Sequence, residues 1–82
     1  EIIVNTLNEK IQLLSDNYEW HIKAELNISS TLEIFDLAGK SIYKVTFFRE
    51  IFLSKNNFQS GVYVFKVSNG NTSKQFKVIL SN

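Results

Sequence analysis

The stretch TLEIFDLAGKSIYKVTFF, residues 31–48, decides the fold of this chain. Its first arm alternates apolar Leu32 and Ile34 with polar neighbours, the period-two pattern of a half-buried strand. Its second arm is dense in β-branched and aromatic residues, which is typical of strands. Between the arms, Asp36 can accept hydrogen bonds from the backbone ahead, and Gly39 tolerates the positive φ that closes a three-residue loop built on a type I turn. The stretch therefore predicts a β-hairpin.

Two runs before this hairpin predict another one. Residues 10–15 alternate weakly and residues 18–26 alternate without a break, which places Trp20 in a core. Between them, Asp16 and Asn17 can supply a two-residue type I′ turn. The inner face of the second run then consists of Tyr18, Trp20, Ile22, Ala24 and Leu26. The register that this turn imposes sets Leu13 opposite Trp20 and Ile11 opposite Ile22.

The last third of the chain predicts a further hairpin after a short strand at residues 51–54. Residues 62–67 are apolar on both faces, which is typical of a strand in the middle of a sheet. The dipeptide Asn69-Gly70 is a strong hairpin signal and leads to a one-sided strand at residues 73–80. The register that this turn imposes sets Tyr63 opposite Phe76 and Phe65 opposite Lys74.

Seven strands, no helical periodicity and no proline predict an all-β fold, an antiparallel β-sandwich. Residues 2–4 can add one short strand before it. With 82 residues the chain has room for one domain, residues 1–82, with a modest core. It contains no methionine and no signal-peptide pattern, so we expect a piece of a longer protein.

Composition excludes several classes of protein. Hydrophobic residues make up 44% of the chain and charged residues 21%, as in folded domains. Without cysteine there are no disulfides and no thiolate metal sites. Apolar runs reach only four residues, against about 20 for a membrane helix. Net charge is +1, yet residues 51–82 carry four lysines and no acid. That asymmetry marks either a face for an anionic partner or chance clustering on a solvated sheet.

The titratable residues do not predict catalysis. His21 stands alone on the polar face of its strand, with no second metal ligand placed by spacing. Asp16 and Asp36 are explained by turns, and no nucleophile has an evident activating base. One arginine and near-neutral charge also argue against nucleic-acid binding. We therefore expect no enzyme, no cofactor and no metal.

Four segments, taken in order, resemble the type A C-terminal sorting domain of the type IX secretion system of Bacteroidetes. They are LEIFDLAGKSI (residues 32–42), IFLS (residues 51–54), FQSGVYVFKV (residues 58–67) and a lysine-bearing last strand. In that family an aliphatic strand runs into Asp-Leu-x-Gly-Lys or Arg, and a later Gly-x-Tyr opens the penultimate strand. The chain departs from the family in having no Tyr-Pro-Asn-Pro-like segment near its start, and Phe58 where leucine is typical.

The resemblance implies a non-catalytic, immunoglobulin-like sandwich at the C-terminus of a larger secreted protein. Its partners would be the type IX translocon, a processing peptidase and a covalently linked upstream cargo domain. It would pass through the periplasm to the cell surface or the extracellular space. The recognition positions carried over are Asp36, Gly39, Lys40, Gly61, Tyr63, Lys74, Lys77 and Val78. We expect an exposed strand end that carries lysines to dock on the translocon by strand addition.

Two other functions fit the same predicted fold. An accessory sandwich module that binds carbohydrate or a protein partner for its parent enzyme would need a row of exposed aromatics. Phe35, Phe48 and Phe52 either supply such a patch or contact the other sheet at the sandwich edge. A structural spacer is the third alternative.

Overall fold

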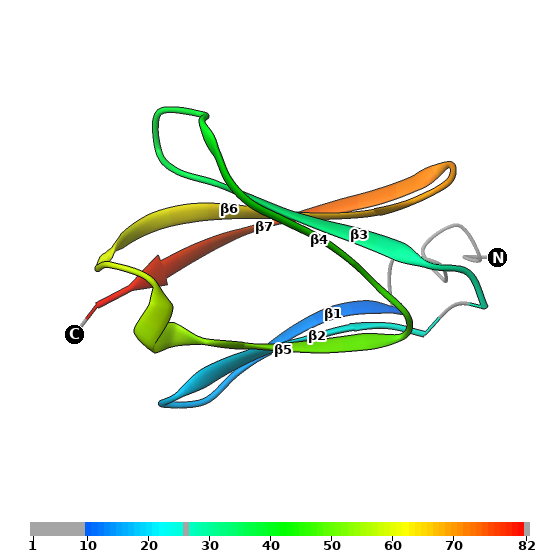
Figure 1. Cartoon of the computed structure of the whole chain (residues 1–82), viewed down its shortest axis with the longest axis horizontal. Coiled ribbons are helices and arrows are strands. Elements are labelled where there is room, and N and C mark those ends of the chain that lie inside the picture. The colour runs from blue at the N-terminus through cyan, green and yellow to red at the C-terminus, as the bar shows by residue number, and fades with distance from the viewer. Residues whose placement is uncertain (1–9, 26, 82) are drawn as a thin grey trace, which may run out of the picture.

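A computed structural model describes residues 10–25 and 27–81 of the chain, and within them seven strands form two antiparallel sheets packed face to face (Figure 1). The three-stranded sheet has the order β1-β2-β5 and the four-stranded sheet β4-β3-β6-β7. The strands are β1 (Ile11–Ser15), β2 (Glu19–Ala24), β3 (Ser30–Phe35), β4 (Ser41–Phe47), β5 (Glu50–Ser54), β6 (Gly61–Asn69) and β7 (Thr72–Leu80), with one 3-10 turn, η1 (Lys55–Asn57). The predicted all-β sandwich is confirmed. The predicted strand at residues 2–4 and the inward placement of Leu26 lie outside the described residues.

The core is made by the period-two faces of the strands. Trp20 is only 2% exposed and packs edge-on against Phe65 and Phe58, with ring centroids 5.0 Å and 5.3 Å away. The fully buried aliphatic side chains around these rings come from both sheets: Ile11, Ile22, Leu32, Ile34 and Val67. The prediction that Trp20 belongs to the core is confirmed.

The central hairpin has the predicted loop. Gly39 has φ +87° and its amide donates to the carbonyl of Asp36 at 3.0 Å, while the amide of Asp36 donates to the carbonyl of Lys40 at 2.9 Å. The pairing of β3 with β4 shifts by a residue between Ile34 and Phe35, so the ladder also carries a β-bulge just beyond the loop.

The predicted registers of the other two hairpins are wrong, each by two residues. In the first hairpin Ser15 lies opposite Trp20, Leu13 opposite Ile22 and Ile11 opposite Ala24. In the last hairpin Tyr63 lies opposite Val78, Phe65 opposite Phe76 and Val67 opposite Lys74. Because side chains alternate with a period of two, a shift of two residues moves the partners and leaves every side chain on its predicted face.

The side chain of Asp16 explains the first error. Its Oδ1 accepts hydrogen bonds from the amides of Tyr18 at 2.8 Å and Glu19 at 2.9 Å, so the turn is centred on Asn17 and Tyr18. Neither central residue has a positive φ, which rules out the predicted type I′ turn. Tyr18 consequently stands 77% exposed in the loop and does not join the inner face.

The turn of the last hairpin is centred one residue later than predicted, because Asn69 belongs to the strand. That displacement of the turn shifts the pairing register by two residues. Asn69 pairs with Thr72, is buried, and donates from Nδ2 to Ser30 Oγ at 3.4 Å. Gly70, with φ +55°, therefore takes the first central position, and Asn71 follows without a positive φ, the pattern of a type II′ turn.

Candidate functional site

The β3–β4 loop holds the first three motif positions. Asp36 Oδ1 accepts hydrogen bonds from the amides of Ala38 at 3.0 Å and Lys40 at 2.9 Å. The carboxylate therefore builds the loop, and Gly39 supplies the left-handed residue in it. The Lys40 side chain is exposed beside them. The loop thus presents one charged side chain on a backbone that Asp36 keeps in place.

Replacing Gly39 by alanine should lower the free energy of unfolding by about 1–2 kcal/mol, because φ +87° is strained for any residue with a Cβ. Gly61→Ala is the matched control. A Cβ there meets Tyr63 and Gln59 atoms only at 3.9–4.0 Å, and its φ lies outside the left-handed region. The control should leave the stability unchanged or raise it by up to about 1 kcal/mol. Urea denaturation measures both, and equal effects would contradict the assigned roles.

Tyr63 fixes the start of β6 against the core. Its ring is buried, lies opposite Val78 of β7 and contacts Phe58 edge-on, with centroids 5.8 Å apart. Its hydroxyl donates to the carbonyl of Gln59, which holds the loop after η1 in place. Gly61, the other motif position here, pairs with Leu80 near the end of β7. Tyr63 and Val78 are therefore parts of the core.

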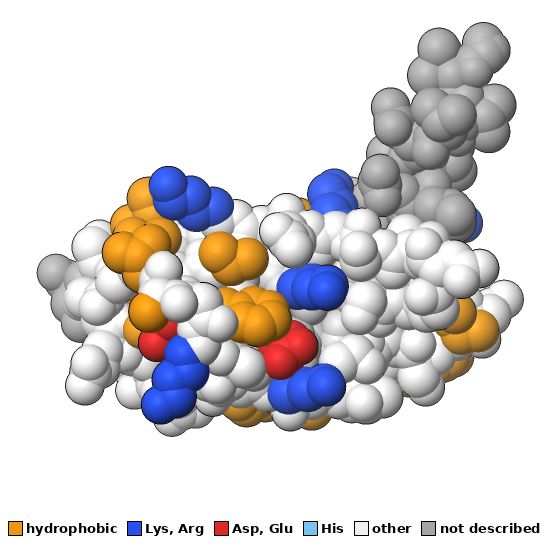
Figure 2. All heavy atoms as spheres, turned by 90° about the horizontal axis from the view of Figure 1, so that it is seen from above, with side chains coloured by type: hydrophobic (Ala, Val, Ile, Leu, Met, Phe, Trp, Pro, Cys, Tyr) orange, Lys and Arg blue, Asp and Glu red, His pale blue; other side chains and the backbone are white. Residues whose placement is uncertain are grey.

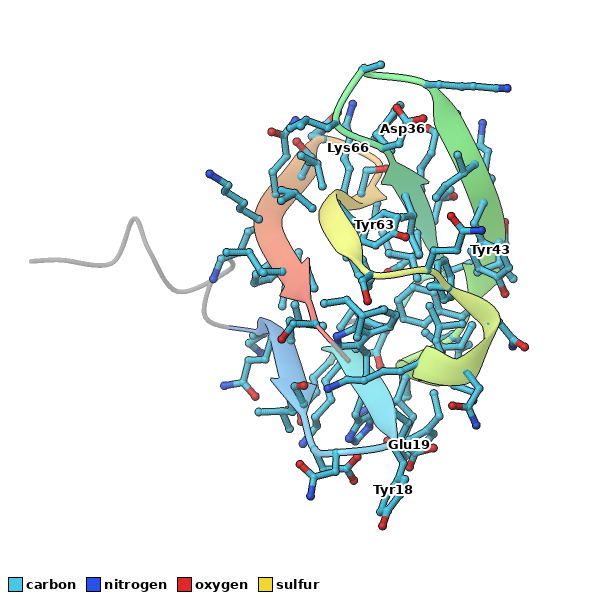
Figure 3. The ribbon with its side chains drawn as sticks, turned by 90° about the vertical axis from the view of Figure 1, so that its left-hand side faces the viewer. Tyr18, Glu19, Asp36, Tyr43, Tyr63 and Lys66 are labelled. Carbon is cyan, nitrogen blue, oxygen red and sulfur yellow. The ribbon has the colours of Figure 1, made fainter. Side chains whose placement is uncertain are left out.

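Residues from two of the motif segments line the same groove. Asp36 and Tyr63, from separate hairpins, both line a hollow of about 440 Å³ at the end of the sandwich (Figure 3). The other lining residues are Ile42, Tyr43, Leu53, Asn57, Phe58 and Gln59. The sequence does not predict this meeting, because it depends on the pairing of β3 with β6. It also misses Tyr43, whose only signal is an aromatic residue in the strand that follows the loop.

Lys74 does not lie on the outer face of the sheet. Its Nζ donates to the backbone carbonyl of Ile11 in β1 at 3.3 Å and lies 5.2 Å from the centroid of the Phe76 ring. Lys74 therefore ties β7 to the other sheet, and its half-buried side chain contributes to the packing of the sandwich.

Lys77 lies on the outer face of the four-stranded sheet. Figure 2 shows lysine and hydrophobic side chains together on this face. Ile79, two residues along β7 from Lys77, is 71% exposed. In the ladder, Lys77 lies opposite Val64, and Val64 lies opposite Phe35. Lys66 and Lys44 flank Glu33 in the neighbouring row. The outer face thus combines positive charge with exposed apolar surface.

The three phenylalanines do not form one patch. Phe35 belongs to the four-stranded sheet, whereas Phe52 is on β5 in the other sheet. Phe52 stacks on His21, with ring centroids 4.0 Å apart. Phe48 follows β4 and has the Arg49 guanidinium 5.8 Å from its ring. The coplanar aromatic row that a carbohydrate module needs is therefore not formed by these side chains.

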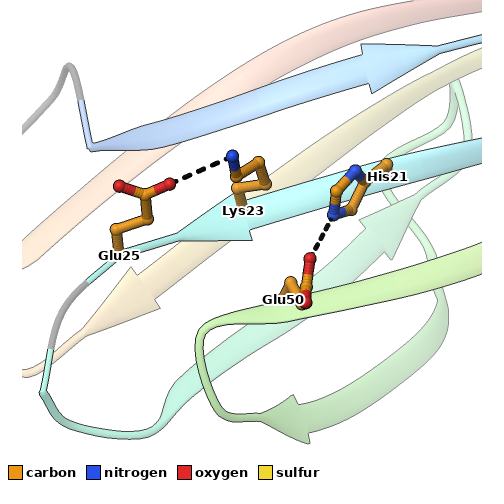
Figure 4. Close-up of polar contacts among 4 residues, drawn as sticks. All are labelled: His21, Lys23, Glu25 and Glu50. Carbon is orange, nitrogen blue, oxygen red and sulfur yellow. Dashed lines mark hydrogen bonds and ion pairs between the residues drawn. The ribbon is translucent and has the colours of Figure 1, made fainter.

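Acidic side chains mark the outer face of the three-stranded sheet. Nε2 of His21 lies 2.7 Å from Oε1 of Glu50, and Nζ of Lys23 lies 3.0 Å from Oε2 of Glu25 (Figure 4). The hydrogen bond from Lys23 lowers the pKa of Glu25. His21 lies on the outer face, as the sequence predicts, with one carboxylate partner and one ring partner there.

β7 is an edge strand among the described residues, since it pairs with β6 on one side only. It is nine residues long and runs to Leu80. In an antiparallel ladder alternate residues direct their N–H and C=O groups away from the partner strand. Among the described residues, the side of β7 that faces away from β6 therefore offers backbone groups for pairing with another chain.

The stability of the fold should depend on pH through the hydrogen bonds that the Asp16 carboxylate accepts. Hydrogen bonds from the amides of Tyr18 and Glu19 lower the pKa of Asp16 from its ordinary value of 3.8. The charged form is favoured by folding, so Asp16 stabilises the fold above about pH 3.8 and loses that contribution as the pH falls through the folded-state pKa. An NMR titration of the Asp16 carboxyl should give a midpoint below 3.8. A midpoint at or above that value would contradict the cap.

Comparison with known proteins adds one finding to this geometry. A family model described as the secretion system C-terminal sorting domain matches residues 7–81, nearly the whole chain. No curated protein matches the chain significantly. The matched range includes all eight motif positions. Among the described residues, no helix is long and apolar enough to cross a membrane.

Proposed function

Since the chain belongs to the family of secretion system C-terminal sorting domains, which direct cargo into type IX secretion, we propose that the secretion machinery reads it at the edge of β7. A sorting role implies interaction with the secretion system and export across the outer membrane, toward the cell surface or the extracellular space. The family is in general non-catalytic, and we propose the same of this chain.

The proposal also covers the steps of export before and after recognition. The domain is joined to an upstream cargo domain, folds in the periplasm and is removed by a processing peptidase during or after export. Within the domain, five of the eight motif positions act in two ways. Tyr63, Val78 and Lys74 keep β7 in place, while Lys40 and Lys77 remain on the surface for a partner.

The observation that carries the proposal is the edge position of β7. An added strand gains backbone hydrogen bonds along the edge, and the side chains beside it give specificity. Ile79 is largely exposed and Lys77 is a charged neighbour on the same face. Lysines on an edge strand also disfavour unspecific pairing with other sheets, so the edge stays open for its partner.

A reporter fusion tests this function. Residues 1–82 joined to a periplasmic reporter should appear outside a bacterium that has type IX secretion, and inside the same bacterium when the secretion system is deleted. Removing residues 74–82 should trap the reporter. That deletion also removes buried Val78 and Leu80, so it tests the need for β7 but not for its edge. A complete fusion that stays inside the cell would overturn the proposal.

A further inference from the structure

We propose that the groove lined by Asp36 and Tyr63 binds an arginine side chain of the docking partner. This inference rests on the proposed function, because it adds a second contact to the one made at the β7 edge. It assigns the groove a ligand of defined chemistry, a guanidinium group on an aliphatic stem. The volume of about 440 Å³ is enough for one long side chain.

The charge of the groove selects a cation. Among the lining residues that the structure describes, Asp36 is the acidic one and none is basic. Its Oδ1 is held by the amides of Ala38 and Lys40, which fixes the plane of the carboxylate. Its Oδ2 receives no hydrogen bond from the described residues, so one oriented acceptor is available to a ligand. An acidic ligand would be repelled by the same group.

The aromatic residues favour a flat cation over an ammonium group. Phe58 contacts Tyr43 and Tyr63 edge-on, with ring centroids 6.2 Å and 5.8 Å away. Tyr43 lies on β4, an edge strand among the described residues, and is part exposed. A guanidinium group can stack on an aromatic face and donate to a carboxylate at the same time, whereas lysine is a compact point charge. Asn57 and Gln59 add amide oxygens at the rim.

The groove lies at the end of the sandwich where β7 also ends, on the β4 side of the sheet. Gly61, just before Tyr63, pairs with Leu80 at the end of β7. The β3–β4 loop, the start of β6 and the end of β7 are at the same end of the sandwich (Figures 1 and 3). A partner that pairs with the edge of β7 and reaches across the start of β6 can place an arginine in the groove, which would make recognition depend on the folded arrangement of both hairpins.

A titration with small probes tests the groove in the 82-residue chain. N-acetyl-arginine methylamide should shift the ring resonances of Tyr43, Phe58 and Tyr63. The uncharged isostere N-acetyl-citrulline methylamide should bind about tenfold more weakly. The key variant is Asp36→Asn, because asparagine keeps the oxygen that accepts the two amides and removes the charge. It should abolish the preference for arginine.

The matched control is Asp16→Asn. Asp16 caps the other hairpin loop with the same kind of bonds and does not line the groove. This variant should keep the preference for arginine in full. Equal shifts with both probes, or an unchanged preference in Asp36→Asn, would overturn the assignment of the groove. A stronger response to the lysine analogue than to the arginine probe would overturn the choice of guanidinium.

Export of the reporter fusion separates this inference from the proposed function. We expect Asp36→Asn to reduce export about tenfold and Asp16→Asn to leave it unchanged. If the wild-type fusion and both variants are exported equally, the groove has no part in recognition and the proposed function stands. If the wild-type fusion is not exported, the proposed function fails and the partner role of the groove fails with it, while the titration still decides whether the groove binds a guanidinium group.

Discussion

Replacing Trp20 by alanine should lower the free energy of unfolding by about 3–5 kcal/mol, a large part of the stability of a small domain. Trp20 is 2% exposed and fills the space between the sheets, where it contacts Phe65 from β6 and Phe58 from the loop after η1. Removal of the indole leaves a cavity that the neighbouring rings cannot close. Urea denaturation followed by circular dichroism measures the loss.

Phe52→Ala is the control for Trp20. Phe52 lies on β5 in the same sheet, but its side chain is 52% exposed and stacks on His21. Its replacement should lower the free energy of unfolding by less than about 1.5 kcal/mol, which is the upper value for the interaction of an aromatic pair in addition to the area it buries. If the two substitutions cost the same, the assignment of Trp20 as the centre of the core is wrong.

A double substitution on β7, Lys77→Glu with Ile79→Glu, should reduce export of the reporter fusion about tenfold or more while the domain stays folded. Lys77 and Ile79 are exposed on the outer face, so the change removes little buried surface. It replaces a positive and apolar edge by a negative one, which alters charge complementarity with any partner that pairs there. Fractionation of cells and immunoblotting of the reporter measure export.

The matched control lies on the edge of the other sheet. Gln12→Glu with Leu14→Glu introduces two acids at exposed positions of β1, which is also an edge strand among the described residues. Export should remain at the wild-type level, and thermal unfolding should change by similar small amounts in both variants. Equal losses of export would mean that the edge of β7 is not the specific contact.

Local sequence patterns predict the strands and their faces well because both depend on near neighbours. Leu32 and Ile34 are buried and Gly39 has the expected positive φ. The pairing register was not predictable with the same accuracy, because one residue at a turn moves it by two. In the first hairpin the position of the turn is determined by the hydrogen bonds that the Asp16 side chain accepts. In the last hairpin it is determined by the buried contact of Asn69 with Ser30.

The candidate site was predictable only in part. Asp36 and Tyr63 carry recognisable local patterns, but their meeting in one groove requires β3 to pair with β6. The family resemblance carries over both lysines of β7 as recognition positions, whereas Lys74 faces the other sheet and Lys77 faces outward. Alternation along the strand places the two lysines on opposite faces of the sheet. The contact of Lys74 with β1 depends in addition on how β7 packs over β1, which is a property of the three-dimensional arrangement.

Site-specific photocrosslinking tests the central claim, that the secretion machinery reads the edge of β7. A photoreactive phenylalanine analogue is placed at Ile79 or, as the control, at Leu14 on β1 in the reporter fusion. Both side chains are exposed. On illumination during export, position 79 should form a crosslink to an outer-membrane component of the type IX translocon, identified by mass spectrometry, and position 14 should not. Crosslinking of that component from position 14 alone, or from neither position while the fusion is exported, would contradict the account.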